Sequence, residues 1–171
     1  AGIDGKLYVA GGHDLGQLFD TLERYDPATD KWETLPAMPT RRGRLGAAAL
    51  DGKLIVVGGV GSSLRSGNHP KAEEYCPQSN SWRSLADMST PLSGIDPVTI
   101  GEEIVIASGS LSHSFSPTNQ VVTFQRLPTG VDRYGASTPE CNGAMQIDPN
   151  LPPLENTPGF ALLNSPHGPP S

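Results

Sequence analysis

The chain has 171 residues, a formal net charge of -6 and a pI near 5.1. That acidic balance argues against a general binder of nucleic acid or of anionic membranes, which would need a basic face. No apolar run reaches the roughly 18 residues of a membrane span, and no secretory signal is visible. The two cysteines, Cys76 and Cys141, lie in unlike surroundings and indicate no disulfide framework. We therefore expect a cytoplasmic protein.

The first predicted strand covers the apolar residues 7–10 and stops at a glycine pair. A continuous apolar run suits a strand that is buried on both faces. Residues 21–25 alternate apolar and polar side chains and predict a second strand. A turn rich in aspartate and proline then leads into a third strand over residues 31–35. Residues 44–50 predict a fourth strand, and the Asp-Gly dipeptide after it predicts a tight hairpin turn.

The same pattern then returns along the chain. Tyr25 and Trp32 have counterparts in Tyr75 and Trp82, 50 residues later. A second apolar strand over residues 54–57 also ends at a glycine pair. A repeat of about fifty residues predicts a modular array in which each unit packs against its neighbours. The strands of each unit are expected to be antiparallel and successive.

A third, worn copy begins at residues 101–109, where Ser108 replaces the first glycine of the pair. The apolar run at residues 120–124 predicts its next strand. The composition changes beyond this point, because residues 111–171 hold 10 of the 17 prolines and no tryptophan. Such a segment can bury little apolar surface. We therefore predict a repeat region over residues 1–110 and a tail that is largely irregular or disordered.

These motifs resemble the Kelch repeat. The markers are the apolar strand that ends in Gly-Gly, the Tyr-x6-Trp spacing, the Leu-Pro-x-Met element, and a Glu-x-Tyr pair at Glu23 and Tyr25 that returns at Glu73 and Tyr75. The resemblance covers about residues 3–109. In detail, the amino-acid sequence of the repeats is most similar to that of the propellers of BTB-Kelch proteins.

The resemblance implies an all-β fold of Kelch-type β-propeller blades, each a four-stranded antiparallel sheet. It places blades at about residues 3–40 and 41–90 and a partial blade at about residues 91–126, followed by the irregular Pro/Ser-rich tail. About two and a half blades make an incomplete propeller, whose exposed faces and sheet edges would favour pairing with other chains.

The repeat residues themselves predict structure rather than chemistry. The aromatic residues could stack on a ligand, but their return at equal spacing favours packing between blades. No helix follows the glycine pairs, and no GxGxxG or Walker pattern is present, so the conformation of a strand end explains them better than phosphate binding does. The residues with predicted structural roles are Gly11, Gly12, Tyr25, Trp32, Gly58, Gly59, Tyr75 and Trp82.

Function is expected in the loops. Strand direction alternates within a blade, so the loop after the glycine pair and the loop that leads into the next unit emerge on one side. The family resemblance implies that partners dock there and that Arg44 is a contact residue. Together with Arg41 and Arg42 it would suit a carboxylate-rich or phosphorylated peptide. Alternatively, these arginines are solvated or pair with carboxylates of the blades. The third unit has Pro91, Leu92 and Gly94 in their places.

We therefore predict a protein–protein interaction module without catalytic residues, metals or cofactors. The predicted partner-binding residues are Arg41, Arg42, Arg44, His13, Arg65, Asn68 and His69. The chain resembles the substrate-recognition propeller of BTB-Kelch ubiquitin-ligase adaptors, whose BTB region, which is not in this sequence, would contact the cullin complex.

Two alternatives stand beside this prediction. The first is a Kelch scaffold that binds cytoskeletal or other partners without ubiquitin. The second and weaker one is a fragment of a propeller enzyme, such as a galactose-oxidase-type oxidase or a sialic-acid epimerase. It is weaker because the four histidines show no metal-ligand spacing. They are His13, His69, His113 and His167.

Overall fold

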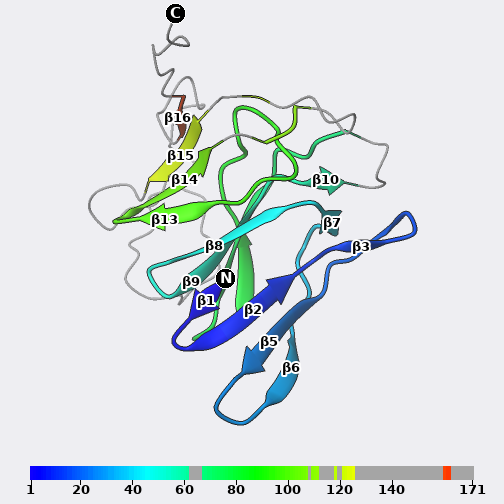
Figure 1. Ribbon diagram of the computed structural model, residues 1–171, viewed down its shortest axis with the longest axis vertical. Coiled ribbons are helices and arrows are strands. Elements are labelled where there is room, and N and C mark those ends of the chain that lie inside the picture. Colours follow the sequence, from blue (N-terminus) through cyan, green and yellow to red (C-terminus); the bar gives the residue numbers. More distant parts are fainter. Residues whose placement is uncertain (62–66, 108, 112–117, 119–120, 126–159, 163–171) are drawn as a thin grey trace, which may run out of the picture.

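The computed structural model describes residues 1–61, 67–107, 109–111, 118, 121–125 and 160–162. These residues form three four-stranded antiparallel sheets, which follow one another along the chain (Figure 1), and short strand pairs in the loops. The predicted all-β architecture of four-stranded blades is thereby confirmed. Within the described ranges, no helix is long and apolar enough to cross a membrane.

Each sheet is one blade, and its strands are hydrogen-bonded in the order in which they occur in the chain. Blade 1 consists of β1 (Gly2–Ile3), β2 (Lys6–Ala10), β5 (Leu22–Asp26) and β6 (Lys31–Leu35). Blade 2 consists of β8 (Gly46–Leu50), β9 (Lys53–Val57), β11 (Ala72–Cys76) and β12 (Ser81–Ser84). Blade 3 consists of β13 (Val98–Ile100), β14 (Glu103–Ala107), β15 (Val121–Gln125) and β16 (Phe160–Leu162).

The register of the strands reproduces the repeat that the sequence predicts. Tyr25 pairs with Trp32 across β5 and β6, and Tyr75 pairs with Trp82 across β11 and β12. The ring centroids of these pairs are 5.1 and 5.3 Å apart. Residues that are directly opposite in an antiparallel pair share one face of the sheet. The two rings of each aromatic pair therefore lie on the same face of their blade.

Blade 3 confirms one prediction and adds one strand that the sequence did not predict. The expected strand at residues 120–124 is β15, which pairs with β14. The outer strand β16 comes from the tail, and its Leu162 lies opposite Val122 of β15. Of the predicted tail, residues 112–117, 119–120, 126–159 and 163–171 lie outside the described residues, and the prediction of an irregular tail stays a prediction there.

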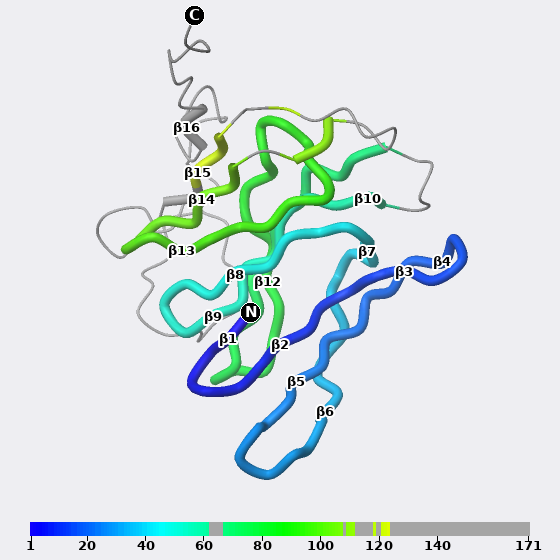
Figure 2. Tube along the Cα trace, in the orientation of Figure 1, coloured from blue at the N-terminus to red at the C-terminus, as the bar shows by residue number. Residues whose placement is uncertain are grey.

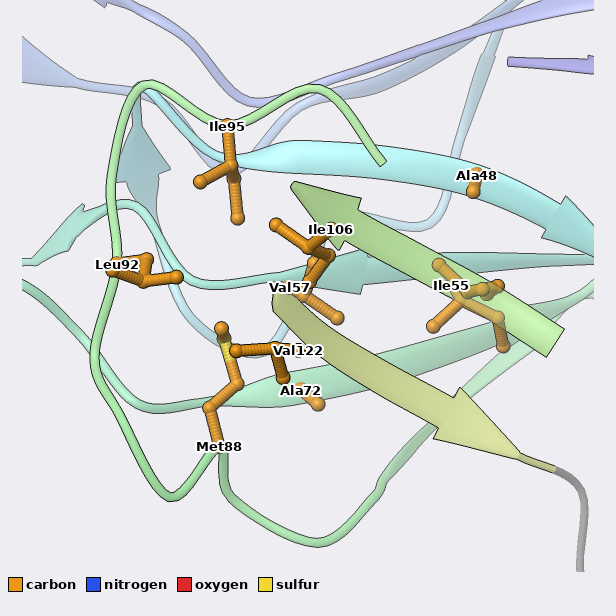
Figure 3. Packing of buried hydrophobic residues seen from close by; sticks show 10 residues of the cluster. Ala48, Ile55, Val57, Ala72, Met88, Leu92, Ile95, Ile106 and Val122 are labelled. Atoms are coloured by element: carbon orange, nitrogen blue, oxygen red, sulfur yellow. The ribbon is translucent and has the colours of Figure 1, made fainter. Parts of the chain in front are cut away.

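Two apolar cores hold the blades together. The first lies between blades 1 and 2 and contains Ile3, Tyr8, Leu22, Leu35, Met38, Leu54, Val56 and Tyr75. The second lies between blades 2 and 3 (Figure 3) and contains Ala48, Ile55, Val57, Ala72, Met88, Leu92, Ile95, Ile104, Ile106 and Val122. The inner strand β8 also contacts the inner strands β1 and β13. The three blades therefore succeed one another around one axis as part of a propeller.

One expectation about covalent structure is wrong. Cys76, the last residue of β11, is buried and disulfide-bonded, although the sequence indicated no disulfide framework. Cys141, the other cysteine of the chain, lies outside the described residues. The surroundings of Cys76 in the sequence could not reveal the bond, because a disulfide depends on distance in the fold rather than on sequence context.

Candidate partner-binding face

The loops after the glycine pairs meet the segments that connect the blades, and together they form the loop face. Connector 1 is residues 36–45, between blades 1 and 2, and connector 2 is residues 85–97, between blades 2 and 3. The N–H of Gly12 donates to the carbonyl of Arg42 in connector 1 over 2.9 Å. One repeat later, the N–H of Gly59 donates to the carbonyl of Leu92 in connector 2 over 2.8 Å. The repeat therefore builds the loop face as well as the sheets.

Short strand pairs extend this layer from blade to blade. The strand β7 (Arg42–Gly43) of connector 1 pairs with β10 (Val60–Gly61), and Gly43 lies opposite Val60. The equivalent pair one repeat later is the bridge between Ser93 and Ser110. Backbone hydrogen bonds close this bridge in both directions at 3.1 and 2.8 Å. Each connector is thus fixed to the glycine-pair loop of the following blade.

All four residues of the two glycine pairs have a positive φ. Gly58 has a φ of +60°, and a Cβ placed on it would lie 2.4 Å from the carbonyl oxygen of Leu92. Gly11 has a φ of +64°, and its Cβ would lie 2.6 Å from the carbonyl oxygen of Arg42. A side chain at either position would be strained and would also displace the connector.

Arg42 is a correction to the predicted site. Its side chain is fully buried, and Nη2 donates to Oε2 of Glu73 over 2.7 Å. Nη1 donates to the carbonyls of Gly58 and Lys71 at 3.1 and 2.7 Å. Burial holds the pKa of the guanidinium below its usual value, although Glu73 opposes that effect. Arg42 is a partner of a blade carboxylate and offers nothing to a bound peptide.

The other two arginines of connector 1 lie nearer the surface. Arg41 has a side chain that is 60% exposed, and Nη2 donates to Oδ2 of Asp20 over 3.1 Å. Arg44 is half-buried, and its guanidinium lies beside Gly94 of connector 2. The carbonyl of Arg44 accepts from the N–H of Gly94 over 2.8 Å. The cluster of three arginines is therefore one exposed cation, one half-buried cation and one buried cation.

The described residues of the longer loop of blade 2 are hydrogen-bonded into the loop face. The amide of Asn68 donates to the carbonyls of Pro91 and Ser110 at 3.1 and 2.5 Å, which ties blade 2 to blade 3. His69 donates its backbone N–H to Gly59, and its Nδ1 accepts from the N–H of Lys71 over 3.3 Å. Burial lowers the pKa of His69, and the charges of Arg42 and Lys71 lower it further. Arg65 lies outside the described residues.

Sequence reasoning missed the tip of the first glycine-pair loop. The strands β3 (His13–Asp14) and β4 (Gln17–Leu18) form a hairpin, which projects from the body of the molecule (Figure 2). Its two-residue turn is Leu15 and Gly16, and Leu15 is fully exposed at a φ of +40°. The X-Gly dipeptide of a two-residue hairpin was the available signal. His13, which is exposed, lies at the base of this hairpin against Gly43.

The Kelch motif family model matches residues 1–39 and 41–89, which together make up more than half of the chain. The chain belongs to the Kelch-repeat family. Kelch-like ECH-associated protein 1A of Danio rerio is 35% identical over 105 residues, which cover 61% of this chain and 17% of that protein. Kelch-like protein 35 of Mus musculus is 24% identical over 186 residues, which cover 97% of this chain and 32% of that protein. The chain spans less than a third of either Kelch-like relative.

The solved structure of YjhT is similar to this chain in fold. It superposes with a TM-score of 0.66 at 19% sequence identity, over 73% of this Kelch-repeat chain and 47% of the YjhT chain. An identity this low bears on the fold alone. Together with the repeat match, it supports the description of the three sheets as blades of an incomplete Kelch propeller.

No metal-binding cluster of three or more histidine, cysteine, aspartate or glutamate side chains occurs among the residues that this Kelch structure describes. His13 lies on the exposed hairpin and His69 in the half-buried loop of blade 2. His113 and His167 lie outside the described residues. The exposed side chains of the loop face include those of His13, Leu15 and Arg41.

Proposed function

We propose that this chain is part of a protein-interaction propeller and binds its partner on the loop face, around the β3–β4 hairpin. The observation that carries the proposal is Leu15, which is fully exposed and has a φ of +40°. A left-handed conformation costs a residue with a Cβ roughly 1–2 kcal/mol. Because Leu15 is exposed, no burial of its side chain offsets that cost. Backbone strain of this kind is concentrated at functional sites.

The surroundings of Leu15 suggest what the partner looks like. The hairpin base packs on connector 1, because a Cβ on Gly43 would lie 3.0 Å from Leu18 and 3.1 Å from His13. Arg41 of the same connector is exposed, and its ion pair with Asp20 is open to solvent. Exposed ion pairs of this kind contribute little to stability. A carboxylate or phosphate of a partner can therefore replace Asp20 while an apolar partner side chain covers Leu15.

The test is a selection of random peptides on the full chain from a display library. Peptides that combine an apolar residue with acidic residues should dominate. Leu15→Asn and Arg41→Ala should each weaken their binding at least about tenfold, as hot-spot truncations do. Thr29→Ala is the matched control, because it lies in the exposed turn between β5 and β6. Peptides that bind Leu15→Asn and the parent chain equally would refute the proposal.

The finer proposal is that the whole protein carries substrates to a cullin-based ubiquitin ligase. The similarity to Kelch-like proteins supports it, as does the resemblance of the repeat sequences to those of BTB-Kelch propellers. In the intact protein, Leu15→Asn should then raise the steady-state level of the bound partner. If Leu15→Asn abolishes binding of the partner but leaves the partner's steady-state level unchanged, the propeller is a scaffold that works without ubiquitin. The cytoplasmic location of this activity stays a prediction.

A further inference from the structure

The outer strand of blade 1 has an open edge. Among the described strands, β6 is hydrogen-bonded to β5 on one side and to no strand on the other. Its residues Lys31 to Thr34 are exposed, and Leu35 is buried. Figure 1 shows the β5–β6 hairpin at the end of the molecule opposite to blade 3. An open edge presents backbone N–H and C=O groups that can pair with a strand of another chain.

Two rows of charged side chains cross the sheet of blade 1 and end at β6. In one row, Arg24 lies opposite Glu33 and forms an ion pair with it. In the other row, Asp26 lies opposite Lys31 and forms an ion pair with Lys6. Both rows lie on one face of the sheet, because positions two apart along a strand share a face. At the open edge, one row therefore ends in a negative charge and the other in a positive charge.

The two charges at the edge are accessible to a partner. The side chain of Glu33 is 57% exposed. Its Oε2 accepts from Arg24, which leaves Oε1 for a second cation. Lys31 is exposed and makes no ion pair with another described residue. Trp32 lies between them in the chain, is 56% exposed and points to the other face of the sheet.

The charge pattern makes this edge complementary to itself. When two identical strands pair antiparallel about a two-fold axis, the residue at the axis lies opposite its own copy. With Trp32 at the axis, Lys31 of each copy lies opposite Glu33 of the other. Opposite charges in such cross-strand positions stabilise the pairing. Both charged rows then continue from one sheet into the other with alternating sign.

Other registers of the same two strands lose this match. With Lys31 or Glu33 at the axis, two like charges would lie directly opposite each other, which is destabilising. With Thr34 at the axis, Glu33 would lie opposite Leu35 and would have no cation across the junction. Charged residues on an edge commonly prevent pairing. Here they favour pairing in one register and oppose it in the neighbouring ones.

The outer strands of the other blades lack this pattern. Ser81, Trp82 and Arg83 of β12 stand where β6 has Lys31, Trp32 and Glu33. Pairing of two β12 strands about Trp82 would place a serine opposite an arginine. The outer strand β16 of blade 3 has the sequence Phe-Ala-Leu and contains no charge. Among the described outer strands, self-complementary charge therefore belongs to β6.

We propose that two copies of this chain associate through their β6 strands, antiparallel about Trp32, so that the two blade 1 sheets form one continuous sheet. The partner is a second copy because the edge matches its own sequence. Pairing of one five-residue strand buries less than the roughly 1,200 Å² of a standard interface, so we expect a weak, concentration-dependent dimer. The inference is independent of the loop-face proposal, because β6 is not part of the loop face.

Sedimentation velocity of the full chain over a series of concentrations tests the association. The parent chain should shift from monomer toward dimer as the concentration rises. Lys31→Glu and Glu33→Lys should each weaken the association at least about tenfold, because each places like charges across the junction. An equimolar mixture of the two variants should recover the dimer, because an acidic edge then meets a basic edge. Ser81→Glu in β12 is the matched control and should change nothing.

Cysteine substitutions test the register. In the proposed dimer, the Cα atoms of residue 32 and its copy are about 4.5–5.5 Å apart, a distance that a disulfide spans. Residue 34 and its copy are four positions out of register, about 13 Å apart along the strand. Trp32→Cys should therefore form a disulfide-linked dimer under mild oxidation, and Thr34→Cys should not. Peptide mapping identifies the cysteines that are joined, and circular dichroism shows that each variant is folded.

Four results would overturn the proposal. The first is a parent chain that stays monomeric at its highest soluble concentration. The second is a dimer that neither charge substitution weakens, because it must then use another surface. The third is a mixture of the two folded charge variants that is no more dimeric than either variant alone. The fourth is equal cross-linking of Trp32→Cys and Thr34→Cys, which would contradict the register.

Discussion

Arg42 and Glu73 form a buried ion pair between two blades, with 2.7 Å between Nη2 and Oε2 and almost no exposure of either side chain. The two residues come from different parts of the fold: Arg42 lies in connector 1, which follows blade 1, and Glu73 lies in β11 of blade 2. The pair therefore reports the docking of blade 1 on blade 2. Its geometry also explains the glutamate of the Glu-x-Tyr motif, whose role the sequence alone did not indicate.

The first prediction concerns this pair. Arg42→Leu and Glu73→Val should each lower the free energy of unfolding by about 3 to 5 kcal/mol, because each leaves a buried charge without its partner. The double variant should lose much less than the sum, because it recreates the apolar pair that Leu92 and Val122 form. Urea unfolding of the four proteins measures the coupling. Additive losses would show that the pair does not act as a unit.

The second prediction separates backbone strain from crowding at a glycine. Gly58 and Gly101 have nearly the same φ, +60° and +61°, but a Cβ on Gly101 meets nothing within 4 Å. Gly101→Ala should cost about 1 kcal/mol for the conformation alone. Gly58→Ala should cost clearly more, because the carbonyl of Leu92 must move away. Thermal unfolding of both variants checks this, and equal losses would contradict the packing argument.

The repeat made the blades predictable from the sequence, because the spacing of Tyr25 and Trp32 and its return at Tyr75 and Trp82 are properties of single hairpins. The burial of Arg42 was not predictable from its neighbourhood, since Arg41 and Arg44 flank the same short strand β7 and are not buried. One signal was present: the third copy of the repeat has Val122 opposite Ile106, where the second copy has Glu73 opposite Val56. The strand β16 was not predicted, because its partner β15 ends 35 residues earlier and no local sequence pattern indicates such a distant pairing.

The third prediction tests whether Leu15 is kept at the cost of stability. Asparagine tolerates the left-handed conformation better than leucine does. Because Leu15 is fully exposed, Leu15→Asn loses no packing and should raise the free energy of unfolding by about 0.5 to 1 kcal/mol. Leu15→Ala serves as a control that removes the side chain without relieving the backbone. A less stable Leu15→Asn chain would mean that the leucine packs against something in solution.

The fourth prediction concerns pH and His69. Burial and the nearby positive charges of Arg42 and Lys71 hold the pKa of His69 below its ordinary value of 6.5. Between the two pKa values the unfolded chain binds more protons than the folded chain, so stability rises with pH in that window. The contribution is fully present above pH 6.5 and is lost as the pH falls through the lower pKa of the folded state.

Asparagine at position 69 removes the titration and can still accept the hydrogen bond from the N–H of Lys71. The loss of unfolding free energy between about one pH unit above and one below 6.5 should therefore be smaller in His69→Asn than in the parent chain. Urea titrations at the two pH values give both losses. An equal loss in the two proteins would show that other groups cause the pH dependence, and a larger loss in the variant would contradict the assigned direction of the pKa shift.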